Sequence, residues 1–270
     1  MLYQYTSISS LALILSRKTI RFTALNLMDD LQEQETADIR NAGQFCFVSC
    51  WTDDSEEQIP MWKMYTSLEA GVRIRLPKYP FLEVPECPEK MGKVLGKQIE
   101  DRSGGVSPKT IIPAWKMAEM KCSTTGIVQQ KNILHKIEYT SDMEKLYPQV
   151  LLNTEKGLYL KLGMLGRYKN TGWAFQREWR YILQFYPFDF NDLDNAEDNF
   201  KTMLIQIING TATLPFSHYD LQINDDAFSQ MEIMLSPKIT DGNRVIVSDL
   251  VEKYNPNATI VESIFKGTLA

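Results

Sequence analysis

The sequence predicts an α+β fold in which helices flank a mixed, mainly antiparallel central sheet. Strands and helices mix throughout the chain, and several expected strands follow one another in its early part. This order differs from the regular strand–helix alternation of a doubly wound sheet. The 270 residues are 44% hydrophobic, which is enough apolar material for one large core. We therefore expect a single domain over residues 1–270.

The chain is expected to begin with a strand followed by a short helix. Residues 2–6 (LYQYT) are rich in aromatic and β-branched side chains, which is typical of a strand. Ser9 or Ser10 can cap the helix, because a serine oxygen accepts hydrogen bonds from the free N–H groups of a first helical turn. We expect this helix to continue to Ser16.

Two further strands are expected after this helix. Residues 19–24 (TIRFTA) alternate, so that Ile20 and Phe22 face inward while Arg21 faces outward or into a cleft. Residues 44–52 (QFCFVSCWT) are apolar at consecutive positions. That pattern predicts a central strand that is covered on both faces.

A second helix is expected to begin at Pro60, because proline suits the first helical turn. Trp62 lies beside its apolar stripe, and Gly71 is well placed to end the helix. Residues 70–76 then predict a strand. The residues of the apolar stripe, at helical spacing, are Met61, Met64, Tyr65 and Leu68.

The middle of the chain is less regular. Residues 77–134 hold six of the twelve prolines, and we expect a variable insertion or a small subdomain there. Residues 136–139 predict a strand. Ser141 and Glu144 have the spacing of a capping box, which predicts a helix over residues 143–165, either continuous or broken or kinked near Pro148.

The remaining elements are predicted from the same periodicities, 3.6 residues for helices and two for strands. No internal repeat or low-complexity tract interrupts them. The expected helices cover residues 114–121, 195–209 and 241–254, and the expected strands cover residues 219–223, 232–235 and 259–265.

The stretch KNTGWAFQREWRYIL, residues 169–183, carries the strongest functional signal. It is expected to be a loop that enters a strand at Phe175. Because successive strand side chains oppose each other, Gln176, Glu178 and Arg180 are expected on one face. This face would present an amide, a carboxylate and a guanidinium in a row, which suits either a binding or catalytic site or a solvated strand surface.

Charge and hydropathy exclude some classes of protein. The formal net charge is -5, which argues against a general binder of nucleic acids or anionic membranes. The apolar run near the N-terminus is too short for a signal peptide or a membrane span. We expect a cytoplasmic protein that does not associate with membranes.

Cysteine and histidine usage argues against a metal site. The two histidines, His135 and His218, have no ligand-like neighbours in the sequence, so no metal is expected. The cysteines do not form the pattern of a disulfide scaffold, and free thiols fit a reducing compartment. These cysteines are Cys46, Cys50, Cys87 and Cys122.

Several segments, in their order, resemble a bacterial family catalogued as domain of unknown function 2971. Together they span nearly the whole chain. This family supplies no settled activity that the resemblance could transfer. The segments are LYQYTS, TIRFTALNLMDDLQE, FVSCW, PMWKMYTSLEAGVRI, KIEY, KNTGWAFQREWR and MLSPKI.

A weaker resemblance does imply an activity. The run Gln176-Arg177-Glu178 looks like the Gln/Glu-x-Glu signature of ADP-ribosyltransferases. This resemblance implies an ADP-ribosyltransferase-like α+β core and an enzyme that consumes NAD, either a transferase or a glycohydrolase. A toxin or a phage-defence effector is the associated biological setting. The partners would be a small-molecule nucleotide and, for a transferase, a macromolecular acceptor.

The resemblance also assigns roles to individual residues. Glu178 would stabilise the positive charge that develops on the ribose, and Gln176 would orient the acceptor. Arg21 or Arg180 would bind the diphosphate through paired N–H donors. The nicotinamide ring would stack on Tyr5, Trp62 or Tyr65.

Three alternatives remain open from the sequence. Glu178 could form a purely structural ion pair with Arg180, with Arg21 or with Arg73. The chain could also be a regulatory module that binds a nucleotide or a partner without catalysis. Lastly, a nuclease could use Mg²⁺ held by the acidic residues of one loop, although the net charge offers no basic track for nucleic acid. Those acidic residues are Asp29, Asp30 and Glu33.

Overall fold

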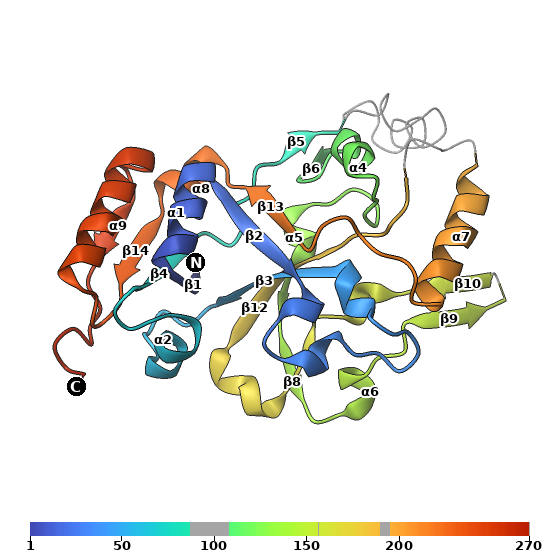
Figure 1. Ribbon diagram of the computed structural model, residues 1–270, viewed down its shortest axis with the longest axis horizontal. Coiled ribbons are helices and arrows are strands. Elements are labelled where there is room, and N and C mark those ends of the chain that lie inside the picture. The colour runs from blue at the N-terminus through green and yellow to red at the C-terminus, as the bar shows by residue number, and fades with distance from the viewer. Residues whose placement is uncertain (87–107, 156, 190–194, 270) are drawn as a thin grey trace.

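A nine-stranded, mostly antiparallel sheet runs through the part of the protein that the computed structural model describes, which is residues 1–86, 108–155, 157–189 and 195–269 (Figure 1). Helices lie on both sides of this sheet, so the expected α+β class is confirmed. The path of the sheet is β13 (His218–Gln222), β2 (Thr19–Ala24), β3 (Cys46–Thr52), β1 (Leu2–Ser7), β4 (Gly71–Leu76), β14 (Glu232–Leu235) and β15 (Thr259–Val261).

The sheet branches at its central strand. Along its whole length β3 pairs with β12 (Glu178–Gln184), which in turn pairs with the short strand β7 (Leu134–Lys136). The other side of β3 is shared: β2 pairs with Phe47 and Val48, and β1 pairs with Thr52. Because β1 and β2 leave β3 at different points, the sheet forks beside residues 49–51. At this fork the side chain of Gln4 donates a hydrogen bond to the Cys50 carbonyl at 3.0 Å.

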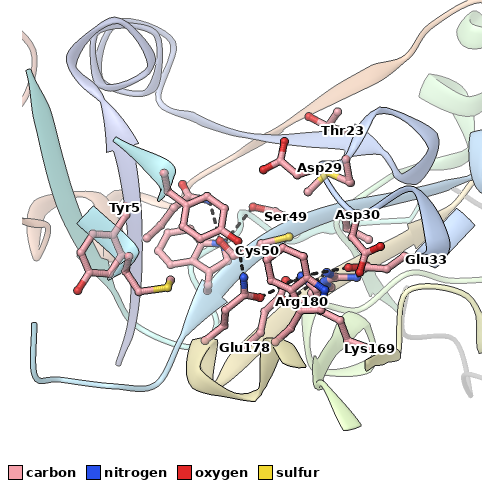
Figure 2. Close-up of a pocket in the computed structure, with 18 of the residues that line it drawn as sticks. Tyr5, Thr23, Asp29, Asp30, Glu33, Ser49, Cys50, Lys169, Glu178 and Arg180 are labelled. Carbon is pink, nitrogen blue, oxygen red and sulfur yellow. Dashed lines mark hydrogen bonds and ion pairs between the residues drawn. The ribbon is translucent and has the colours of Figure 1, made fainter. Parts of the chain in front are cut away.

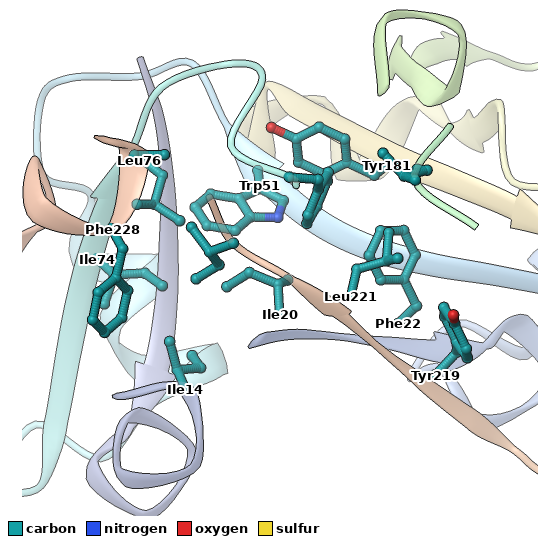
Figure 3. Close-up of a cluster of buried hydrophobic side chains, with 14 of the residues drawn as sticks. Ile14, Ile20, Phe22, Trp51, Ile74, Leu76, Tyr181, Tyr219, Leu221 and Phe228 are labelled. Carbon is teal, nitrogen blue, oxygen red and sulfur yellow. The ribbon is translucent and has the colours of Figure 1, made fainter. Parts of the chain in front are cut away.

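The larger core lies on one face of the sheet. There α1 (Ile8–Arg17) and α9 (Asp241–Tyr254) contact each other and cover one end of the sheet. Figure 3 shows this core, in which side chains from β2, β3, β4 and β12 meet. Phe81, Ile112 and Met117 pack into the same core. The described part of residues 77–134 therefore shares the main core, whereas residues 87–107 of the expected insertion, with Cys87, lie outside the described residues.

The opposite face carries two smaller apolar clusters with a polar zone between them. One cluster lies under α7 (Ala196–Ile208) and the 3-10 helices η1 (Leu25–Leu27) and η3 (Ala42–Phe45). The other consists of Tyr5 with Met61 and Trp62 of α2 (Ile59–Tyr65). α7 and the hairpin of β9 (Leu151–Thr154) with β10 (Gly157–Leu160) lie at the far end of the molecule from α9 (Figure 1). The candidate site lies on this face.

Several expected boundaries shift for local reasons. The residue that caps α1 is Ser7, and not Ser9 or Ser10 as expected. The Ser7 side-chain oxygen accepts a hydrogen bond from the Ser10 N–H at 3.1 Å. α2 ends at Tyr65 with a Thr66 cap, and Gly71 begins β4 instead of ending the helix.

The prediction of a helix over residues 143–165 is wrong. There α6 (Met143–Leu146) is followed by the β9–β10 hairpin and then by the short 3-10 helix η5 (Leu162–Met164). Pro148 cannot donate a helical hydrogen bond, and Gly157 adopts a φ of 118° in the hairpin, a conformation that disfavours other residues. The strand expected over residues 136–139 is divided between β7 and β8 (Glu138–Thr140), with buried Ile137 between them.

The other described elements are short. One of them, β11, pairs in parallel with β8. They are β5 (Val84–Pro85), β6 (Lys109–Thr110), α4 (Ala114–Met120), α5 (Gln130–Ile133), β11 (Tyr168–Asn170), α8 (Asp225–Ser229) and the 3-10 helices η1 (Leu25–Leu27), η2 (Leu31–Gln34), η3 (Ala42–Phe45), η5 (Leu162–Met164) and η6 (Thr171–Gln176). None of the described helices is both long and apolar enough to cross a lipid bilayer.

A buried carboxylate attaches the C-terminal segment to α2. Glu57 accepts hydrogen bonds from Trp62 Nε1 at 2.9 Å, from Ser263 Oγ at 2.6 Å and from the Ile264 N–H at 2.7 Å. The carboxylate therefore holds three donors from two distant segments. It also fixes the position of α2, which supplies one wall of the candidate site.

We expect Glu57→Gln to lower the free energy of unfolding by about 1–3 kcal/mol, because an amide presents one acceptor oxygen and leaves a buried donor unsatisfied. Urea denaturation measures this loss, and hydrogen exchange at residues 263–265 should become faster. Glu252→Gln, on the exposed side of α9, is the matched control. Equal stabilities of the two variants would show that Glu57 does not hold the C-terminal segment.

Candidate functional site

A cavity of about 230 Å³ opens at the fork between β1 and β2 (Figure 2). Segments far apart in the sequence contribute to its wall: β1, β2, η2, β3, α2, β11, η6 and β12. The wall combines charged groups with aromatic rings, a mixture typical of sites for polar small molecules. The wall includes Tyr5, Arg21, Glu33, Cys50, Tyr65, Lys169, Trp173, Gln176, Glu178 and Arg180.

The segment before β12 differs from the one predicted from the sequence. The strand does not begin at Phe175, because η6 occupies residues 171–176 and β12 begins at Glu178. Arg177, between them, adopts the left-handed conformation with φ of 46°. This left-handed residue reverses the direction of the backbone. Because of the reversal, Gln176 at the end of η6 and Glu178 at the start of β12 both line the cavity.

Arg180 is the centre of a buried ion-pair network. Its Nε lies 2.6 Å from Glu178 Oε1, and its Nη2 donates to Glu178 Oε2 at 3.1 Å. A third nitrogen, Nη1, pairs with Glu33 of η2 and is 3.4 Å from the Gly166 carbonyl. The Arg180 side chain is only 1% exposed. Its positive charge is therefore held between two carboxylates from different segments.

Lys169 of β11 completes this network. Its Nζ lies 3.3 Å from Glu178 Oε2 and donates to Gln176 Oε1 at 2.9 Å. The same nitrogen is 3.0 Å from Glu33 Oε1, an ion pair without hydrogen-bond geometry, and it lies 4.6 Å from the centre of the Trp173 ring. Two cations thus balance two carboxylates. Figure 2 shows the four charged side chains together at one end of the cavity.

Polar neighbours fix the two predicted catalytic side chains. Gln176 donates through Nε2 to the Tyr65 hydroxyl, so α2 and η6 meet across the cavity. The backbone N–H of Glu178 donates to the Tyr139 hydroxyl at 2.7 Å. Gln176 and Glu178 are 3% and 5% exposed. Their positions are therefore set by the fold before any ligand binds.

The charges decide the protonation states. Burial acts most strongly on the Glu178 carboxyl and disfavours its charged form, but Arg180 and Lys169 outweigh burial and lower its pKa. Glu178 is therefore ionised at neutral pH. Burial, reinforced by the negative charge of Glu178, raises the pKa of the Cys50 thiol and of the Tyr65 hydroxyl. Cys50 therefore stays protonated and lacks the thiolate character of a nucleophile.

The residues expected to bind a cofactor divide into two groups. Tyr5 and Tyr65 line the cavity, as do Arg21 and Arg180. Trp62 does not: its side chain is fully buried, packs edge-on against Tyr5 at 4.8 Å and donates to Glu57. Because its ring is covered on all sides, Trp62 is not available to stack on a ligand.

The two arginines also differ from the expectation. Arg180 is saturated by Glu178 and Glu33, so its N–H groups are already used. Arg21 forms a two-donor pair with Asp220 of β13, at 2.9 and 3.1 Å, and its side chain is 41% exposed. Arg21 therefore stands at the mouth of the cavity, while Arg180 lies at its base.

The acidic loop does not form a metal site. Asp30 caps η2 by accepting from the Gln32 N–H at 3.1 Å, Asp29 is exposed, and Glu33 belongs to the ion-pair network. Over residues 1–86, 108–155, 157–189 and 195–269, no three His, Cys, Asp or Glu side chains converge as a metal would require. The cysteines at 46, 50 and 122 are free.

Sequence reasoning missed the roles of Lys169 and Glu33. Lys169 opens the stretch that carried the functional signal, and Glu33 entered only as one of three acids for a metal. Both side chains are deeply buried, at 6% and 3% exposure. Charged residues in loops are usually exposed, so no local signal in the sequence distinguishes these two from solvated ones.

Comparisons of the chain with protein-family models, with curated proteins and with solved structures return no match. The two resemblances drawn from short motifs therefore stay predictions.

A pair of substitutions tests the reversal at Arg177. Arg177→Gly and Arg177→Ala both remove the exposed ion pairs with Asp53 and Asp54, so the two variants differ only in the Cβ atom. We expect the glycine variant to be more stable by about 1 kcal/mol, because the left-handed conformation disfavours Cβ. At an ordinary strand position alanine would be the more stable by about 0.5–1 kcal/mol. Chemical denaturation of both variants measures the sign, and a more stable alanine variant would exclude the reversal.

Proposed function

We propose that this protein cleaves the bond between nicotinamide and ribose in NAD, as an ADP-ribosyltransferase-like transferase or glycohydrolase. The observation that carries the proposal is the position of Glu178: a buried, ionised carboxylate at the base of a cavity that has aromatic walls. Such a carboxylate is suited to stabilise a cation that forms beside it in a site with little water. The surrounding residues support a substrate with a ring, a sugar and a diphosphate.

The reaction has a simple balance. The bond between the nicotinamide nitrogen and the anomeric carbon of ribose breaks, and nicotinamide leaves as a neutral molecule with the bonding electrons. Positive charge builds on the ribose in the transition state, as in glycoside cleavage. A new bond then forms to an oxygen or nitrogen of water or of a macromolecular acceptor, and the proton of that group passes to solvent.

The described side chains can be assigned to these steps. Glu178 stabilises the ribosyl cation, and Gln176, whose oxygen and nitrogen are both engaged, holds Tyr65 and Lys169 in place. The rings of Tyr5, Tyr65 and Trp173 line the cavity and offer faces for nicotinamide. At about 230 Å³ the cavity is smaller than the ~300–1,000 Å³ typical of whole ligand pockets. It suits the nicotinamide riboside portion, with the diphosphate directed to the mouth, where binding to Arg21 requires this side chain to leave Asp220.

The second candidate is a regulatory module that binds a nucleotide without consuming it. The saturation of Glu178 favours this candidate, because Arg180 and Lys169 already occupy both carboxylate oxygens. A carboxylate whose charge is shared with two cations stabilises a new cation less strongly. In this case the cavity still selects a ligand, and no bond is broken.

Two substitutions in the same network separate the candidates. Glu178→Gln and Glu33→Gln each remove one carboxylate charge that contacts both Arg180 and Lys169. Breaking a buried ion pair costs about 3–5 kcal/mol of stability, so we expect both variants to be destabilised to a similar degree. We expect only Glu178→Gln to lose NAD turnover, by about 10²–10³-fold.

Nicotinamide release from NAD measures turnover, in buffer and in cell extract that supplies an acceptor. Thermal denaturation of the same samples with and without NAD measures binding. Saturable stabilisation by NAD without nicotinamide release would support the binding module. Absence of both binding and release in the parent protein would reject both candidates for NAD, and equal losses of turnover in the two variants would reject the assigned role of Glu178.

A further inference from the structure

A second cavity, of about 190 Å³, lies further along β12 than the first, since Glu178 and Arg180 line the first and Ile182 and Gln184 line the second. Its wall includes His135 of β7, Arg167, Ile182 and Gln184 of β12, and residues of the 124–133 segment. None of these residues belongs to the ion-pair network of the first site. The proposed NAD chemistry therefore leaves this cavity without a role.

The charge in this cavity is not balanced. Among the residues that line it, Arg167 carries a full positive charge and no aspartate or glutamate is present. Across the described part of the chain, Arg167 forms no ion pair, unlike Arg180, which binds two carboxylates. Its Nε is buried and, within the same described residues, has no hydrogen-bond partner. Because water cannot reach this nitrogen, a ligand in the cavity would meet the terminal nitrogens of the guanidinium, whose charge no carboxylate in the cavity wall pairs.

The neighbouring histidine does not compensate this charge. Nε2 of His135 lies 3.5 Å from Arg167 Nη2, at the limit of a hydrogen bond. Burial, and next the positive charge of Arg167, lower the pKa of His135 to about 4, so the ring is neutral at pH 7. A neutral imidazole can orient the guanidinium without cancelling its charge.

The backbone gives Arg167 a fixed position. Gly166, which precedes it, has φ of 73°, and a Cβ there would lie 3.3 Å from Val48 Cγ1 and 3.4 Å from Cys46 Sγ. The Arg167 carbonyl accepts from the Glu138 N–H at 3.0 Å. The guanidinium is therefore presented from a tightly packed segment between β3 and β8, as a preorganised anion site requires.

We propose that the cavity at Arg167 binds an oxyanion the size of phosphate, either free or as the phosphate group of a small molecule. Arg167 supplies the charge and paired N–H donors, which suit the oxygens of a phosphate group. His135 acts as a positioning residue for the guanidinium. This site is independent of the proposed NAD reaction, because it uses neither Glu178 nor Gln176.

Thermal denaturation of the whole chain, with calorimetry for affinity, tests this site. The probes are inorganic phosphate and ribose 5-phosphate, each compared with chloride at matched ionic strength. We expect both probes to raise the Tm of the parent protein saturably. Arg167→Gln should weaken binding by about tenfold or more. Arg40→Gln, which removes one exposed arginine elsewhere on the surface, should leave binding unchanged.

Arg167→Lys keeps the charge but removes the paired donors, so it decides the result if Arg167→Gln fails to fold. Weaker phosphate binding by this lysine variant supports the site. Tighter binding of ribose 5-phosphate than of phosphate supports a phosphorylated small molecule, and equal binding supports the free anion. Absence of stabilisation beyond chloride, or unchanged binding in the Arg167 variants, would overturn the proposal. Neither outcome affects nicotinamide release, so the two proposals fail separately.

Discussion

The ion pairs around Arg180 are the constraint on which the site depends. One guanidinium and one ammonium, both almost fully buried, are neutralised by Glu33 and Glu178. Taking four charges out of water is costly, and the cost is recovered only while all four remain in contact. Because these residues come from η2, β11 and β12, the network fixes three separate segments relative to one another. These three segments form part of the wall of the first cavity.

The fork in the sheet supplies the space that this network lines. In an ordinary sheet the edge of β3 would be covered by one neighbour along its whole length. Here β2 pairs near one end of β3 and β1 near the other, and the Gln4 amide bonds to the Cys50 carbonyl between them. A backbone carbonyl away from a strand partner needs such a donor. The gap between β1 and β2 therefore becomes an opening in which polar side chains can meet a ligand.

The two cavities differ in electrostatic character although residues of β12 line both. In the ion-pair network at the first cavity two carboxylates balance two cations, and Arg21, Asp29 and Asp30 also line the wall. At the second, a single arginine next to a neutral histidine is left with an uncompensated charge. Lys169 and Arg167 are two residues apart. Lys169 nevertheless forms ion pairs with Glu33 and Glu178, whereas Arg167 forms none with the described residues. Their local sequence does not account for this difference, because it arises from which distant segments reach each of them.

The sequence by itself determined the elements whose signal is local. The alternation of residues 19–24, the apolar run before Thr52 and the helical period of residues 241–254 each describe how one segment meets a core, and β2, β3 and α9 formed as expected. The placement of Glu178 and Arg180 on one strand face also followed from the two-residue period. Tertiary structure alone decided that Arg177 reverses the backbone, that Trp62 is covered on all sides, and that Glu33 and Lys169 are buried beside Arg180. The physical reason is that the energy of a buried charge depends on partners supplied by distant segments, and periodicity within one segment carries no information about those partners.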